Sequence, residues 1–116
     1  SMSKKVDGFV FPTDNVVVAG MAVVLRTTVP AHQVTVSGDM GSLAAGCTAA
    51  MTVDYYTLGL QAAQLGADIL EGRRSAAETP IGVQDVKNPT FNVKAMKRLG
   101  LEIPEDLKAG ALLWQK

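Results

Sequence analysis

The chain has 116 residues, and its eleven Lys and Arg balance eleven Asp and Glu, so the formal net charge at pH 7 is zero. This balance argues against non-specific binding to nucleic acid or an anionic membrane, because both require a surplus of positive charge. Hydrophobic residues make up 47% and charged residues 19%, which is typical of a globular domain. The single cysteine, Cys47, excludes an intrachain disulfide and a cysteine-based zinc cluster. Residues 1–5 are interpreted as a tag scar or linker.

Glycine and proline divide the remaining chain into alternating strands and helices. The expected strands span residues 6–11, 33–37 and 47–53, while residues 91–93 are too few to assign. The expected helices span residues 14–28, 54–71 and 94–99, with one helical turn at 42–46 and a last helix from Pro104 toward Leu113. Residues 73–80 are expected to form a loop. Alternation of this kind predicts an α/β fold with a largely parallel sheet.

The first long helix lacks a polar face, because residues 16–25 contain no charged or hydrogen-bonding side chain. A helix that is apolar all round is usually buried on more than one side. We expect some of Val17, Met21 and Val24 to face a partner subunit or a missing part of the same protein. The alternative is a central core helix within a small domain.

The second long helix has two distinct faces. Its apolar stripe consists of Leu58, Ala62, Leu65 and Ile69, which follow one another at helical spacing. Beside it runs a polar stripe made of Thr57, Gln61, Gln64, Asp68 and Glu71. The apolar stripe predicts that this helix packs against another surface.

Each of the three N-terminal strands ends in polar residues. These clusters are Pro12-Thr13-Asp14-Asn15, Ser37-Gly38-Asp39 and Asp54-Tyr55-Tyr56. Because parallel strands point the same way, the three clusters are expected on one rim of the sheet, where open α/β sheets bind ligands. Each also has a structural interpretation, since Thr13, Asp14 and Asp54 can cap helices and Gly38-Asp39 can form an ordinary turn.

The sequence does not predict a catalytic constellation, a metal site or a cofactor. His32 is the only histidine, and we expect it on the surface or satisfied within a loop. Cys47 is expected to be a buried small residue, so the two form no nucleophile and base pair. The segment 38–41 matches neither a phosphate-binding loop nor the dinucleotide pattern. Acid–base catalysis by Asp14, Asp39 and Asp54 stays open as an alternative.

Five segments together resemble a known family over nearly the whole chain. They read VDGFVFPTDN at 6–15, VTVSGD at 34–39, AAG to VDYYTLG across 44–59, ILEG at 69–72 and NVKAMKRLGLEIPE at 92–105. In order and spacing they are similar to the ABC-transporter substrate-binding proteins of the tryptophan/tyrosine-binding type. The resemblance implies a periplasmic-binding-protein fold of type I, in which two α/β lobes enclose a ligand cleft.

The resemblance covers only the last third or so of such a protein, so the first lobe and the start of the second are missing. It implies that residues 6–51 form a βαβ segment of the C-terminal lobe and that 89–116 close that lobe. Residues 52–88 would be a crossover segment whose helix packs on the missing lobe. We therefore expect the isolated chain to self-associate through the apolar faces of 16–25, of 58–69, or of both.

The implied function is that of the solute-binding component of an ABC import system, which passes a small molecule, expected to be an amino acid, to a membrane permease. The parent protein would be periplasmic, or extracellular and membrane-anchored, with its secretory signal upstream of this chain. Alternatives are a ligand-sensing domain of the same fold in a signalling protein and, less favoured, an α/β enzyme. An acidic side chain suits the ammonium group of an amino acid, and a tyrosine ring can stack on a flat ligand. The implied ligand-binding residues are Thr13, Asp14, Asn15, Asp39, Asp54 and Tyr55.

Overall fold

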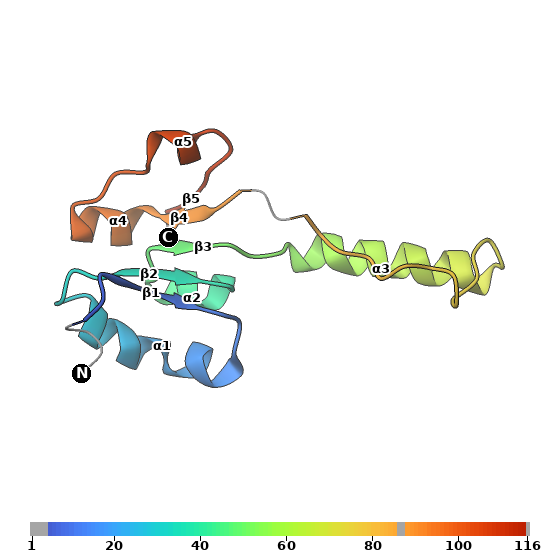
Figure 1. Cartoon of the computed structure of the whole chain (residues 1–116), viewed down its shortest axis with the longest axis horizontal. Coiled ribbons are helices and arrows are strands. Elements are labelled where there is room, and N and C mark those ends of the chain that lie inside the picture. Colours follow the sequence, from blue (N-terminus) through green and yellow to red (C-terminus); the bar gives the residue numbers. More distant parts are fainter. Residues whose placement is uncertain (1–4, 86–87, 116) are drawn as a thin grey trace. The chain divides into compact units, whose positions relative to one another are not determined.

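The computed structural model describes residues 5–85 and 88–115, so residues 1–4 of the predicted tag scar lie outside the described residues. The chain divides into two compact units (Figure 1). Unit 1 comprises Ser1–Thr52 and Lys87–Lys116, and unit 2 comprises Val53–Val86.

In the described part of unit 1, five strands form one sheet in the order β1-β2-β3-β4-β5. They are β1 (Gly8–Phe11), β2 (Val34–Ser37), β3 (Ala49–Ala50), β4 (Thr90–Asn92) and β5 (Leu112–Trp114). Only the β3–β4 pair is antiparallel, and the other three pairs are parallel. The predicted α/β class with a largely parallel sheet is therefore confirmed, although the third strand has two residues instead of the seven expected.

Helices cover both faces of this sheet (Figure 1). They are α1 (Asn15–Thr28), α2 (Met40–Ala45), α4 (Val93–Leu99) and the short α5 (Glu105–Lys108). Side chains alternate between the two faces along each strand, so Phe11 joins the core under α1 while Val36, Ala49 and Phe91 pack with Met96 of α4 on the other face. The sheet thus separates two small apolar cores.

The expected helix from Pro104 toward Leu113 is wrong beyond its first turn. Helix α5 ends at Lys108, and Gly110 then adopts a positive φ of 91°, in the left-handed region that favours glycine. A Cβ at Gly110 would also lie 2.7 Å from the Asn88 side chain. This turn redirects the chain, so that Leu112–Trp114 pair with β4 and complete the sheet.

Helix α1 belongs to the core of unit 1. Met21 is fully buried, and Leu25 packs with it against Cys47. Val17 and Val24 are partly buried against the same cluster. Met21 therefore does not face a partner subunit or a missing part of the protein, which the sequence predicts for some of these three residues, and the alternative of a core helix describes α1 better. The outward side of α1 instead carries Val16, which is 80% exposed, and Val23.

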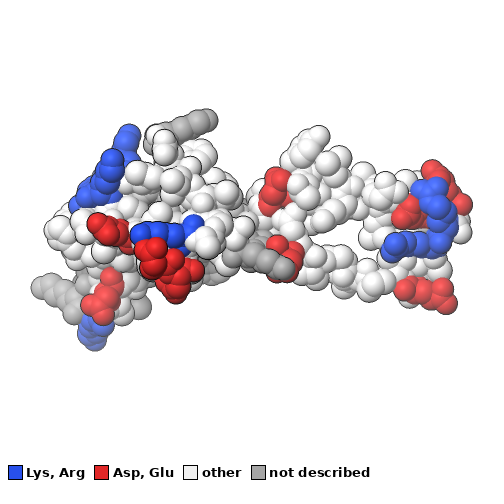
Figure 2. Space-filling view, turned by 90° about the horizontal axis from the view of Figure 1, so that it is seen from above, with Lys and Arg blue, Asp and Glu red and all other residues white. Residues whose placement is uncertain are grey.

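Unit 2 consists of helix α3 (Tyr55–Leu70), a loop, and an extended return segment. The helix is within one residue of its predicted bounds, and residues 73–80 form neither helix nor strand, as expected. Near the start of α3 the Gln84 side chain ties the return segment to the helix: its Oε1 accepts from the Asp54 N–H at 2.8 Å, and its Nε2 donates to the Asp54 carbonyl at 3.4 Å. On the face seen in Figure 2, the charged side chains of this unit gather toward its two ends.

Candidate functional site

The ends of strands β1 and β2 meet at one rim of the sheet. The Gly38 N–H donates to the Phe11 carbonyl at 2.9 Å, and the Thr13 hydroxyl donates to the Gly38 carbonyl at 2.9 Å. A Cβ at Gly38 would lie 2.8 Å from Thr13 Oγ1, so this close approach needs glycine. The two loops that the sequence predicts at the rim are therefore joined, and they bring Thr13, Asp14 and Asn15 next to Gly38 and Asp39.

Asp14 is the N-cap of α1. Its Oδ1 accepts from the N–H groups of Val16 at 2.9 Å and Val17 at 3.0 Å, which satisfies two of the helix's free donors. The side chain is exposed, and its Oδ2 makes no hydrogen bond within the described residues. Capping and ligand binding are therefore compatible at Asp14, because one carboxylate oxygen stays available to a donor from outside.

Asn15 begins α1 and has an exposed side chain that makes no hydrogen bond within the described residues. Its amide can both donate and accept. Together with Oδ2 of Asp14, it gives the rim an uncommitted polar surface at the start of α1.

Asp39 has a different environment, because its side chain is buried. It caps α2: Oδ1 accepts from the Ser42 N–H at 2.7 Å and Oδ2 accepts from the Ser42 hydroxyl at 2.8 Å. Both oxygens are therefore already engaged, although each carboxylate oxygen has a second lone pair. No role for Ser42 at the site is predicted from the sequence. Its position three residues after the acidic N-cap Asp39 is the pattern that could have predicted this contact.

Asp54 and Tyr55 belong to unit 2, at the start of α3. Asp54 Oδ2 accepts from the Thr57 hydroxyl at 2.5 Å, and Oδ1 accepts from the Tyr56 N–H at 3.1 Å. The hydroxyl of Thr57, more than any other cause, holds the pKa of Asp54 below its usual value, since it stabilises the charged carboxylate. The Tyr55 side chain is exposed.

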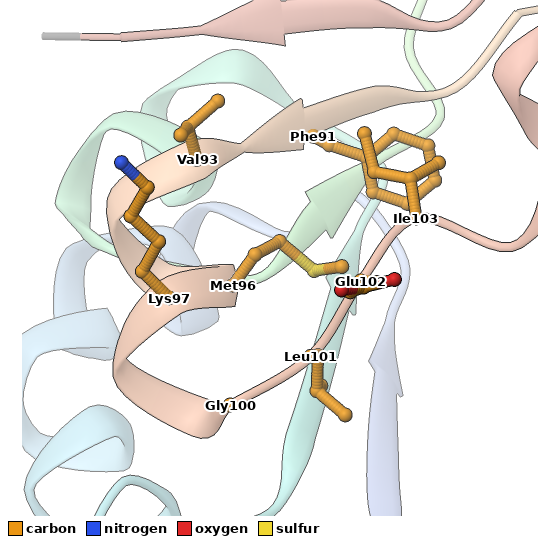
Figure 3. Close-up of a pocket in the computed structure, with 8 residues that line it drawn as sticks. All are labelled: Phe91, Val93, Met96, Lys97, Gly100, Leu101, Glu102 and Ile103. Atoms are coloured by element: carbon orange, nitrogen blue, oxygen red, sulfur yellow. The ribbon is translucent and has the colours of Figure 1, made fainter.

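A hollow in the described part of unit 1 contains none of the predicted site residues. This groove of about 490 Å³ lies beside α4, where Phe91 and Ile103 lie close together and Met96 points toward them (Figure 3). Its lining is mainly apolar, with Lys97 and Glu102 as its charged members. It offers no cluster of polar groups that would orient a small polar ligand.

His32 and Cys47 lie in different environments. His32 is exposed, and Cys47 is fully buried with its thiol 3.5 Å from the Met21 sulfur, as the sequence predicts for both. Burial is the main cause that raises the pKa of the Cys47 thiol, so the reactive thiolate is disfavoured.

Among the described residues no group of three His, Cys, Asp or Glu could hold a metal ion. Within the same residues, none of the helices is both long enough and apolar enough to cross a membrane.

The chain belongs to the family of ABC transporter substrate-binding proteins, whose family model matches residues 1–112. Among curated proteins it is similar to the tyrosine-binding protein of Clostridioides difficile strain R20291, with 28% identity over 102 residues. That alignment covers 88% of this chain and 29% of the relative. The family predicted from the sequence is thus confirmed.

Solved structures agree with this assignment. A Streptococcus pneumoniae ABC domain in complex with L-Trp superposes with a TM-score of 0.79 and 25% identity, over 97% of this chain and 38% of that chain. The ligand-free, open structure of a substrate-binding protein with adhesive properties from Clostridium difficile has a TM-score of 0.80 and 23% identity, over 99% and 38% of the two chains, and shows the common fold. The chain therefore spans less than two fifths of these relatives.

Proposed function

We propose that this chain is part of the solute-binding component of an ABC import system and that it supplies one wall of a cleft for an amino acid. The observation that carries the proposal is the rim where the β1 and β2 loops are joined by the hydrogen bond from Thr13 to Gly38. The names of the tyrosine-binding relative and of the L-Trp complex support an aromatic amino acid as the ligand.

In the proposed site on unit 1, Oδ2 of Asp14 accepts a charge-assisted hydrogen bond from the ligand ammonium. Asn15 offers an amide to the ligand's polar groups, and the Thr13 hydroxyl holds the loop in place. The buried Asp39, engaged by Ser42 through both oxygens, adds negative charge beneath the rim and fixes the second loop. In unit 2, taken by itself, Asp54 holds the start of α3, and the exposed Tyr55 side chain is suited to stack on a flat ligand. The protein binds and releases its ligand without chemical change.

The two units take different places in the proposed protein. Unit 1 belongs to the C-terminal lobe, and unit 2 is the crossover segment that packs on the other lobe. Closure of the lobes around the ligand excludes water, and the closed form delivers the ligand to a membrane permease. We place this protein in the periplasm, or outside the cell and anchored to the membrane, because a solute-binding protein meets its ligand there.

Self-association of the isolated chain is part of the same proposal. Helix α3 has no buried residue. Within its apolar stripe Leu58, Leu65 and Ile69 are half-buried and Ala62 is exposed, so the stripe is only partly covered. On α1, the large side chains that remain available are Val16 and Val23.

Calorimetric titration with the twenty amino acids tests the proposed function. In a protein extended to the relatives' length we expect binding of tyrosine or tryptophan. The 116-residue chain should bind several orders of magnitude more weakly, because one wall cannot exclude water.

Asp14→Ser keeps an N-cap but removes the charge, and it should weaken binding of the amino acid about tenfold to a hundredfold. Asn15→Ala should also weaken binding.

Thermal melting of the same variants is the control, because neither substitution should lower the melting temperature appreciably. Full affinity in Asp14→Ser, or turnover of any amino acid tested, would contradict the proposal. Micromolar binding by the 116-residue chain alone would contradict the requirement for two lobes.

A further inference from the structure

The serine that ends β2 is buried and bonds to the rim loop that follows it. Ser37 is 2% exposed, and its hydroxyl donates to the Asp39 carbonyl at 3.0 Å. A bond from a side chain to the carbonyl two residues further on closes a small ring around the residue between them, which is Gly38. The ring fixes the direction of the Gly38 carbonyl, so Ser37 constrains the loop from beneath.

Gly38 passes this constraint to the other rim loop. Its carbonyl accepts from the Thr13 hydroxyl at 2.9 Å, and its N–H donates to the Phe11 carbonyl at 2.9 Å. The two loops have no spare room between them, because a Cβ at Gly38 would lie 2.8 Å from Thr13 Oγ1 and 3.1 Å from the Thr13 nitrogen. A shift of Gly38 therefore moves Thr13 and, with it, the next residue, Asp14.

Helix α2 holds the acceptor of the Ser37 bond in place. The Asp39 carbonyl also accepts from the Leu43 N–H at 3.4 Å, and the Asp39 carboxylate is bonded through both oxygens to Ser42, which is 1% exposed. The hydroxyl of Ser37 thus donates to a carbonyl that is anchored at a buried helix start. A bond to such a fixed acceptor restrains the loop more than a bond to a free loop would.

We propose that Ser37 is a positioning residue for the amino-acid site. By fixing the Gly38 carbonyl it holds Thr13, and it thereby places Asp14 and Asn15 for the ligand. Ser37 acts through these residues and does not touch the ligand, because it is buried. The inference rests on the proposed function, since it takes residues 13–15 as the part of the rim that contacts the amino acid.

Calorimetric titration with L-tryptophan and L-tyrosine, on the protein extended to the relatives' length, tests this role. We expect Ser37→Ala and Thr13→Val each to weaken binding about fivefold to tenfold, as for the loss of one hydrogen bond. In the double variant the loss should not exceed that of the weaker-binding single variant, because both bonds act through the Gly38 carbonyl. A serine that only stabilised the fold would leave the affinity unchanged below the melting temperature.

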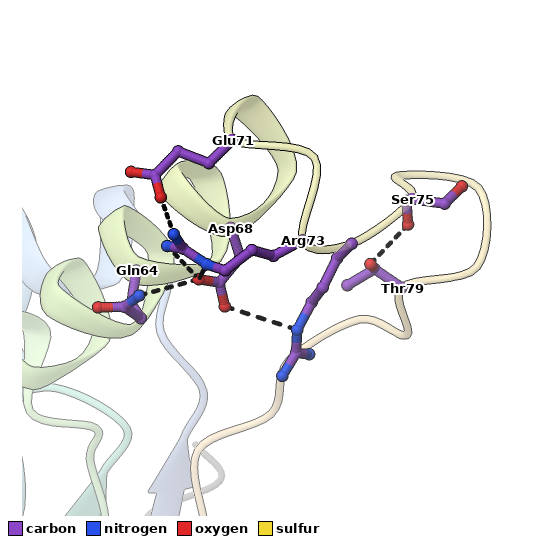
Figure 4. A network of polar contacts seen from close by, with 7 residues as sticks. Gln64, Asp68, Glu71, Arg73, Ser75 and Thr79 are labelled. Atoms are coloured by element: carbon purple, nitrogen blue, oxygen red, sulfur yellow. Dashed lines mark hydrogen bonds and ion pairs between the residues drawn. The ribbon is translucent and has the colours of Figure 1, made fainter.

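Two variants that remove a hydroxyl elsewhere are the controls. Thr48→Val removes a buried hydroxyl that accepts from the Thr35 N–H at 3.2 Å, near the start of β2. Thr79→Val removes a hydroxyl that donates to the Ser75 carbonyl at 2.6 Å in the loop of unit 2 (Figure 4). Neither should change the affinity by more than about twofold, even where the melting temperature falls, so a loss confined to the rim variants does not come from general destabilisation.

Amide chemical shifts of the isotope-labelled 116-residue chain give a readout that needs no ligand. We expect Ser37→Ala to shift the resonances of residues 13–15 and Thr48→Val to leave them in place. Unchanged resonances at 13–15, full affinity in Ser37→Ala, or additive losses in the double variant would overturn the role of Ser37 while the proposed function stands. Absence of binding by the unsubstituted extended protein would overturn the proposed function itself, and this inference with it.

Discussion

Three aspartates of the proposed site each precede a helix, and each carboxylate bonds to the helix that follows. The sequence allows both a capping and a ligand role at these positions, because both need a short acidic side chain. The structure distinguishes the two roles by burial and by hydrogen bonding. Asp39 is buried and both of its carboxylate oxygens accept hydrogen bonds, whereas Asp14 is exposed and its Oδ2 accepts none within the described residues. Sequence alone could not predict this difference, since it depends on how tightly each loop packs.

At the residue scale, the pKa of Asp54 tests the capping geometry. Its pKa is lowered mainly by the Thr57 hydroxyl, so folding favours the charged carboxylate. This contribution to stability is present above the usual pKa of aspartate and is lost as the pH falls through the lowered value. We expect Thr57→Val to raise the pKa of Asp54 toward its usual value, measured by an NMR pH titration of the carboxyl carbon.

The control for that titration is Asp68, whose pKa is lowered mainly by Arg73 and should not change in Thr57→Val. An unchanged Asp54 pKa in the variant would show that the short contact between Thr57 and Asp54 does not persist in solution.

At the element scale, the sequence predicts an element correctly where its pattern of apolar and polar residues extends over several turns. Helix α3 is within one residue of its predicted ends because its stripes and its acidic N-cap agree. The C-terminal segment was misassigned because a short apolar run such as Ala109–Leu113 fits a helix or a strand equally well. Only pairing with β4 decides in favour of the strand.

The packing of α1 could not be predicted from composition, because a helix without polar residues offers no face to choose. The structure places Met21 in the core and Val23 outside. We expect Met21→Ala to lower the free energy of unfolding by about 2–5 kcal/mol, through lost burial and the cavity left behind. Urea denaturation measures this loss.

Val23→Ala on the same helix is the matched control for Met21→Ala. It should change the free energy of unfolding by only about 0.5 kcal/mol or less, as surface substitutions usually do. Equal losses in the two variants would mean that α1 is buried on both sides in solution, as the sequence first suggested.

At the scale of the whole molecule, the chain divides into two units, and the proposed function assigns unit 1 to a lobe and unit 2 to a crossover segment. The first two polar clusters meet at one rim because β1 and β2 are parallel neighbours, a consequence that follows from the sequence pattern. The third cluster, with Asp54 and Tyr55, belongs to unit 2 instead. The chain leaves the sheet of unit 1 after the two-residue β3, and no periodicity in the sequence marks that departure.

The central claim is that the rim formed by residues 13–15 and 38–39 contacts an amino acid. Amide chemical-shift mapping of the isotope-labelled 116-residue chain, titrated with L-tryptophan and L-tyrosine, tests this claim most directly, because the method detects weak binding by a single wall. We predict saturable shifts concentrated at Asp14, Asn15 and Gly38 that disappear in Asp14→Ser. Shifts concentrated at Phe91 and Ile103 in the groove beside α4, or no shifts up to the solubility limit of either amino acid, would contradict the claim.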